Sequence, residues 1–101
     1  MNYGQVEQSL PLLNQAEAAF RLSNDQQNLA NVLSHRATAY RLLGKYQASL
    51  SDSREAIQLV NGNLLLNDIK AEANRAMGMC FYHLGQLDEA IPCWLTSLEG
   101  Y

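Results

Sequence analysis

The stretch Gly85-Gln86-Leu87-Asp88-Glu89-Ala90-Ile91-Pro92 decides the fold, because related stretches begin at two earlier glycines. The first reads Gly4-Gln5-Val6-Glu7-Gln8-Ser9-Leu10-Pro11, and the second reads Gly44-Lys45-Tyr46-Gln47-Ala48-Ser49-Leu50-Ser51. The glycines stand 40 and 41 residues apart, at positions 4, 44 and 85. Repeats of this length are typical of arrays in which each unit is a pair of helices. The sequence therefore predicts stacked helical hairpins.

Each column of this alignment has a physical reason. Glycine permits a sharp turn between antiparallel helices, because it adopts a left-handed conformation without strain. Five residues later a small side chain lets two helices approach closely, and a large aliphatic residue follows it. The small residues are Ser9, Ser49 and Ala90. We therefore expect Gly4, Gly44 and Gly85 to mark equivalent corners.

The residues before the two later glycines also align. A small residue stands seven positions before each glycine, at Ala37 and Gly78. An aromatic residue stands four positions before it, at Tyr40 and Phe81. This order of small residue, aromatic residue and turn is expected for the first helix of each hairpin.

Apolar residues recur with helical spacing along most of the chain. The predicted helices span residues 6–21, 27–42, 46–59, 65–83 and 87–99. The last helix is expected to bury one stripe, made of Leu87, Ala90, Ile91, Trp94 and Leu98. Breaks are predicted at Ser23-Asn24-Asp25 and at Asn61-Gly62-Asn63, where Gly62 suits the left-handed residue that closes a helix.

These features together resemble the tetratricopeptide repeat (TPR) family. One repeat matches its pattern at Leu33, Ala37, Tyr40, Gly44, Tyr46, Ser49 and Ala56, and the next at Gly78, Phe81, Gly85, Leu87, Ala90, Trp94 and Ser97. The period is about six residues longer than the usual TPR spacing, as in TPR regions of bacterial signalling regulators and polarity scaffold proteins. Arg36, Asn74 and Ser53 replace residues that are usually large and apolar or aromatic.

The resemblance implies an all-α fold of about five helices. The hairpins would form a right-handed superhelix, an α-solenoid, in a single domain spanning residues 1–101. Within it we expect a half repeat at 4–21 and full repeats at 27–60 and 65–100.

Composition narrows the classes of function. Hydrophobic residues make up 48% of the 101 residues, which is ordinary for a globular chain. The net charge of -3 and the scattered basic residues argue against binding to nucleic acid. No apolar run is long enough for a membrane span, and no secretory signal precedes the two cysteines, Cys80 and Cys93. We therefore expect a cytoplasmic protein with reduced thiols.

Few residues carry chemistry in a recognisable pattern. Cys80 and His83 have a spacing that would let them share a metal, but a structural zinc site needs four well-spaced ligands. The acidic pairs Asp52/Glu55 and Asp88/Glu89 have no nucleophile or phosphate-binding motif beside them. We predict neither catalysis, nor a cofactor, nor a bound metal.

The TPR resemblance implies that the first helices of successive hairpins line a concave groove. The residues expected there are Asn31, Ser34, His35, Thr38 and Arg41 from one hairpin and Glu72, Arg75, Met79 and Tyr82 from the next. Such a set suits a peptide with a carboxylate or free backbone carbonyls. The lysine and asparagine clamp of chaperone-binding TPRs is absent, because Ser34, Thr38, Arg75 and Met79 stand at its positions.

The leading hypothesis is thus a protein–protein interaction module within a larger bacterial regulator or scaffold, holding a partner peptide or helix. Two alternatives stay open. One is a structural piece that forms homo-oligomers through exposed end helices. The other is a ligand-sensing segment of a transcription activator, with a small molecule near Met79, Tyr82 and Cys80.

Overall fold

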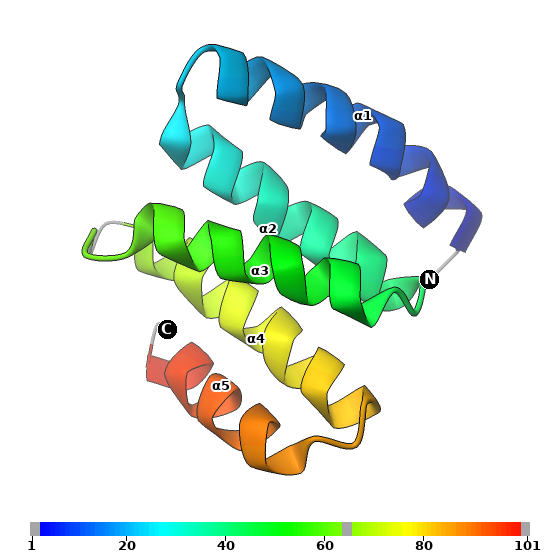
Figure 1. The fold of residues 1–101 in the computed structure, drawn as a ribbon, viewed down its shortest axis with the longest axis vertical. Coiled ribbons are helices and arrows are strands. Elements are labelled where there is room, and N and C mark those ends of the chain that lie inside the picture. The colour runs from blue at the N-terminus through cyan, green and yellow to red at the C-terminus, as the bar shows by residue number, and fades with distance from the viewer. Residues whose placement is uncertain (1–2, 64–65, 100–101) are drawn as a thin grey trace.

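The structure, a computed structural model, describes residues 3–63 and 66–99 and contains five α-helices joined by short turns (Figure 1). The helices are α1 (Tyr3–Leu22), α2 (Gln26–Leu42), α3 (Tyr46–Val60), α4 (Asn67–His83) and α5 (Leu87–Glu99). No strand occurs in these two segments, so the all-α prediction is confirmed. The predicted helix 65–83 and repeat 65–100 include residues 65 and 100, which lie outside the described residues.

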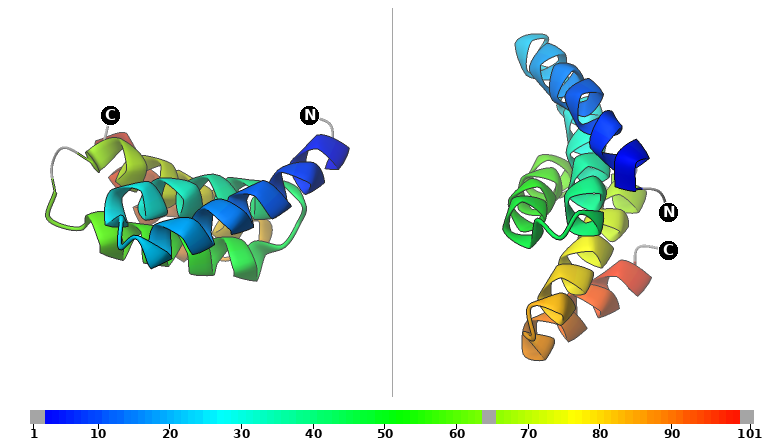
Figure 2. Two further views of the ribbon diagram at one scale, coloured as in Figure 1. Left: turned by 90° about the horizontal axis from the view of Figure 1, so that it is seen from above. Right: turned by 90° about the vertical axis from the view of Figure 1, so that its right-hand side faces the viewer.

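The helices pack mainly in chain order, and α2 also contacts α4. Within the pairs α2–α3 and α4–α5 the helices run antiparallel (Figure 1). Seen from the side in Figure 2, α3 lies on one side of the α2–α4 pair, and the first turns of α1 lie on the other. On the side that points away from α3, the α2–α4 pair is therefore flanked by the first turns of α1 (Figure 2).

Two of the three predicted corners are equivalent. Gly44 and Gly85 both adopt a φ of 78°, a left-handed conformation that favours glycine. In each turn the N–H of the residue after the glycine donates to the carbonyl of the aromatic residue, Tyr40 or Phe81, at 2.8 and 2.7 Å. This pattern closes the helix C-terminus and reverses the chain.

The prediction of a third corner at Gly4 is wrong. α1 begins at Tyr3, three residues before the predicted start, so Gly4 lies within its first turn. At Gly44 and Gly85 a preceding helix must end and reverse. Before Gly4 the structure describes only Tyr3, which already belongs to α1. At Gly4 the helical conformation of α1 satisfies the backbone hydrogen bonds without a strained turn.

The core forms where small residues let the helices approach. Ser49 of α3 and Ala37 of α2 are both fully buried, and the Ser49 hydroxyl donates to the Ala37 carbonyl at 2.6 Å. Gly78 of α4 lies so close to α5 that an added Cβ would stand 2.5 Å from the indole of Trp94. The small positions predicted from the repeat thus set the spacing between helices.

The prediction for the buried face of α5 is only partly right. Ala90 is fully buried and Trp94 is half-buried against α4, as predicted. Leu87, Ile91 and Leu98 are exposed, so the prediction that they are buried is wrong. α5 carries two adjacent apolar strips, and α4, its main neighbour, covers only one of them.

Candidate binding groove

Between α2 and α4 lies a surface hollow of about 380 Å³. Four of the nine residues predicted for the groove line it, namely Asn31, Ser34, His35 and Glu72. Asp68 and Ile69 complete the lining, and sequence analysis missed both. Asp68 precedes Glu72 by four residues, so the two lie on one face of a helix. Helical periodicity could therefore have predicted Asp68 as a groove residue once Glu72 was chosen.

A second hollow, of about 280 Å³, lies between α1 and α2. Its lining consists of Gln5, Val6 and Ser9 from α1 and His35, Thr38, Ala39 and Leu42 from α2. Because His35 lines both hollows, they adjoin across α2. We call the two together the groove. The prediction omitted its α1 side, since the TPR resemblance places only the first helices of hairpins in the groove and makes residues 4–21 the second half of a repeat.

The other predicted residues lie around the groove in different ways. Thr38 lines the second hollow, and its hydroxyl is 3.5 Å from the Glu72 carboxylate. Arg41 is half-buried, and its Nε is enclosed without a hydrogen-bond partner. Met79 is half-buried and Tyr82 is exposed, and neither lines either hollow.

The charge of the groove does not suit the peptide carboxylate that we expected as one possible ligand group. Arg75 forms an ion pair of 2.7 Å with Glu72 of its own helix, which offsets both charges and leaves Asp68 as the charge of the larger hollow without a balancing cation in its lining. Neither hollow is lined by Lys or Arg, whereas Asp68 and Glu72 both line the larger one. This lining favours an N–H donor or a basic side chain of a ligand over a carboxylate.

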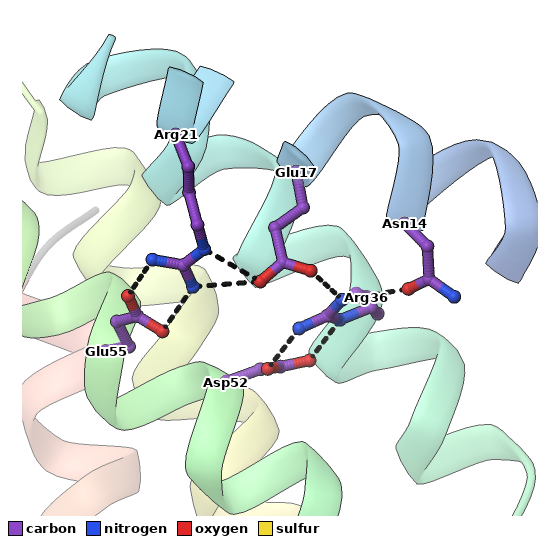
Figure 3. A network of polar contacts seen from close by, with 6 residues as sticks. All are labelled: Asn14, Glu17, Arg21, Arg36, Asp52 and Glu55. Carbon is purple, nitrogen blue, oxygen red and sulfur yellow. Dashed lines mark hydrogen bonds and ion pairs between the residues drawn. The ribbon is translucent and has the colours of Figure 1, made fainter. Parts of the chain in front are cut away.

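A network of ion pairs joins α1 and α2, which line the groove, to α3 (Figure 3). Arg36 of α2 binds Asp52 of α3 through two parallel hydrogen bonds of 2.7 and 2.8 Å. The same guanidinium donates to Glu17 and Asn14 of α1. Only 11% of the Arg36 side chain and 9% of the Asp52 side chain are exposed. One cation therefore holds three helices together, at a position where the TPR resemblance led us to expect an apolar residue.

Arg21 extends the network from α1 to α3. Its guanidinium donates to Glu17 at 2.8 Å and to both oxygens of Glu55, at 2.8 and 2.9 Å (Figure 3). Burial raises the pKa of Glu17, but the hydrogen bonds from Arg36 and Arg21 outweigh it and lower the pKa below its usual 4.5. Asp52 and Glu55, considered above as an acidic pair, each form an ion pair within this network.

The soft metal ligands do not converge. Cys80 is fully buried among core residues, and burial raises the pKa of its thiol. His83 is exposed and its ring stacks on Tyr46, with 5.4 Å between ring centroids. In the segments 3–63 and 66–99, three or more His, Cys, Asp or Glu side chains nowhere gather in a way that would hold a metal ion.

Comparison with known proteins adds no assignment. No family model, curated protein or solved structure matches this chain. Within the described part of the chain, the helices are too short or too polar to cross a membrane.

Proposed function

We propose that this chain is a protein–protein interaction module that binds a peptide or helix of a partner in the groove. In this proposal the hairpins form a TPR-like α-solenoid with a right-handed superhelical course. The module would act within a larger cytoplasmic regulator or scaffold of bacterial origin, and it would perform no catalysis and need no cofactor.

The observation that supports the proposal is that the two hollows share His35. A groove that crosses α1, α2 and α4 can take a chain that passes over several helices. Each hollow, at about 280 and 380 Å³, is close to the lower limit of pockets that enclose a whole small molecule, about 300–1,000 Å³. Spaces of this size suit individual side chains of a peptide.

The two hollows differ in chemistry, which defines the ligand. Val6, Ala39 and Leu42 give the hollow beside α1 an apolar lining, suited to an aliphatic or aromatic side chain. The hollow beside α4 has the carboxylate of Asp68, and beside it that of Glu72, which already pairs with Arg75. We therefore expect a peptide with an apolar residue at one position and a Lys or Arg at another.

Selection from a random-peptide display library on the immobilised protein tests this proposal. We expect enriched peptides to combine an apolar residue with a basic residue. His35→Trp would place a larger side chain where the two hollows meet and weaken binding of an enriched peptide by about tenfold or more, equivalent to about 1.4 kcal/mol. Gln58→Trp is the matched control, since Gln58 is exposed on α3, away from the groove.

Two results would contradict the proposal. One is the enrichment of acidic peptides only, and the other is equal binding by both tryptophan variants. The ligand-sensing alternative has less support, since Cys80 is fully buried and neither Met79 nor Tyr82 lines either hollow of the groove.

A further inference from the structure

One face of α5 carries large apolar side chains that no other helix covers. Leu87, Ile91, Leu95 and Leu98 are 51, 52, 56 and 71% exposed, and they follow one another at helical spacing. We call these four residues the α5 strip. It lies outside both hollows of the groove and needs a separate explanation.

The internal repeat shows what covers the same face one hairpin earlier. In the 41-residue register, Ile91 corresponds to Leu50 and Leu87 to Tyr46. Leu50 is only 2% exposed, because it packs in a cluster with Cys80 and Phe81 of α4. Tyr46 is half-buried and stacks on His83 of α4.

The same comparison extends to both edges of the strip. Leu98 corresponds to Ile57, which is half-buried and packs against a core cluster that includes Ala73 of α4. Tyr82, at the other edge, corresponds to the half-buried Arg41, yet Tyr82 is 52% exposed. At each compared position the earlier hairpin has the side chain more buried. A helix placed on α5 as α4 lies on α3 would cover Leu87, Ile91 and Leu98, whereas Leu95 would stay at its margin, because its counterpart Arg54 is exposed.

Charge indicates which kind of helix fits. Asp88 and Glu89 are exposed beside the strip, and α5 contains no Lys or Arg. Pairing with α5 of a second copy in antiparallel orientation would bring these carboxylates to the negative end of the partner helix dipole. A second copy's α1, with exposed Leu12 and Leu22, offers only Arg21, which already pairs with Glu17 and Glu55. A basic helix from another protein avoids both conflicts.

We propose that the α5 strip is a second docking surface, which binds a basic amphipathic helix of a partner protein in the way that α3 binds α4. The apolar side of that helix would pack on the strip, and its Lys or Arg residues would lie near Asp88 and Glu89. The chain would then hold two partner segments at once, one in the groove and one at α5.

The structure also supplies a suitable probe. The probe is a peptide with the sequence of residues 67–83, stapled between positions 75 and 79 because isolated helices of this length are marginal in water. Asp68→Lys and Glu72→Lys make it basic, and Cys80→Ala prevents oxidation. Trp94 is the only tryptophan of the protein and lies at the edge of the strip, so its fluorescence reports binding without a label.

Titration of the whole protein with this peptide should give a saturable change in Trp94 fluorescence. Ile91→Lys is expected to weaken binding by at least about tenfold, because it places a charge at the centre of the strip. Leu12→Lys is the matched control, an exposed apolar residue on α1, and should change affinity by less than about twofold. Both positions are exposed, so both variants should keep the helical circular dichroism of the parent protein.

Three outcomes would overturn the proposal. The first is no saturable binding, and the second is equal weakening by Ile91→Lys and Leu12→Lys. The third is a dimer in light scattering of the protein alone that Ile91→Lys converts to a monomer, which would assign the strip to a second copy. A peptide that keeps Asp68 and Glu72 should bind more weakly at low salt, and equal affinity would refute the role of charge.

Discussion

The ion pair between Arg36 and Asp52 allows a quantitative test of how α1, α2 and α3 are held together. Arg36→Met removes the cation but keeps much of the side-chain volume. The carboxylate of Asp52, only 9% exposed, then loses both of its bonds to the guanidinium. Breaking a buried pair in this way costs about 3–5 kcal/mol. Because Glu17 still binds Arg21, we expect the lower end, about 3 kcal/mol of unfolding free energy.

The reverse variant should cost less. In Asp52→Leu the Arg36 guanidinium keeps its bonds to Glu17 and Asn14, so only part of its charge loses compensation. A hydrogen bond to a charged group contributes about 1.5–3 kcal/mol, and we expect a loss near the lower limit. The double variant Arg36→Met/Asp52→Leu leaves neither charge of this pair behind. It should therefore be more stable than the sum of the single losses predicts, by about 1.5 kcal/mol or more.

Urea unfolding, followed by circular dichroism, measures all four proteins of this cycle. Thermal unfolding offers a second estimate, since about 1 kcal/mol shifts the Tm of a domain of this size by about 4–8 °C. Arg36→Met should then lower Tm by about 12–24 °C. Additive losses in the cycle, with a coupling below about 0.5 kcal/mol, would refute the argument that Asp52 and Arg36 stabilise the fold as a pair.

Three further predictions concern pH, backbone and thiols. Because the folded-state pKa of Glu17 is lowered, the contribution of Glu17 to stability is complete above pH 4.5 and is lost as the pH falls through the folded-state pKa. Glu17→Gln should therefore flatten the pH dependence of the unfolding free energy below pH 4.5, as measured by urea unfolding. Gly44→Ala should destabilise the protein by about 1 kcal/mol, because residue 44 has a left-handed backbone conformation. Gly4→Ala should be neutral or slightly stabilising, because Gly4 is helical. Equal losses of stability in thermal unfolding of the two variants would contradict this contrast. Burial raises the pKa of both cysteine thiols, and Cys80 is the more buried of the two. Half-buried Cys93 should therefore react with a thiol reagent first, and Cys80 should react only on unfolding. Mass spectrometry of the labelled peptides would show this order.

Local signals in the sequence were sufficient to predict the helices, the turns at Gly44 and Gly85, and the breaks at 23–25 and 61–63, where Gly62 is left-handed with a φ of 86°. Helical periodicity located all five helices, and the glycine pattern located the left-handed turns at Gly44 and Gly85. Both signals act within a few residues of the chain, so no knowledge of the packing was needed. The prediction failed at Gly4 because the same residue type also fits the first turn of a helix.

The packing of α5 could not be predicted from its own residues. Apolar side chains cover more than half of its circumference, and its periodicity does not reveal which strip α4 covers. Small residues at Ala90 and Gly78 allow close approach, which draws that side of α5 onto α4 and leaves Ile91 exposed. The decisive interaction is between two helices, and the pattern of a single helix does not contain it.

The candidate site was predicted in part. The TPR resemblance led us to expect Asn31, His35 and Glu72 in one groove, and the structure brings them to one hollow. The pairing of Arg75 with Glu72, which changes the charge of the groove, depends on side-chain conformations. Arg36 was noted only as a departure from an apolar position, since its partners lie 16 to 22 residues away in the chain.

The nearly sequential packing of the helices has a consequence for local unfolding. α2 contacts three helices, α1, α3 and α4, and α4 likewise contacts α2, α3 and α5. In contrast, α1 packs mainly on α2 and α5 mainly on α4. Amide hydrogen exchange should therefore be slowest in α2 and α4 and fastest in α5, which has no counterpart of the Arg36 network, so that the molecule loosens from its ends inward.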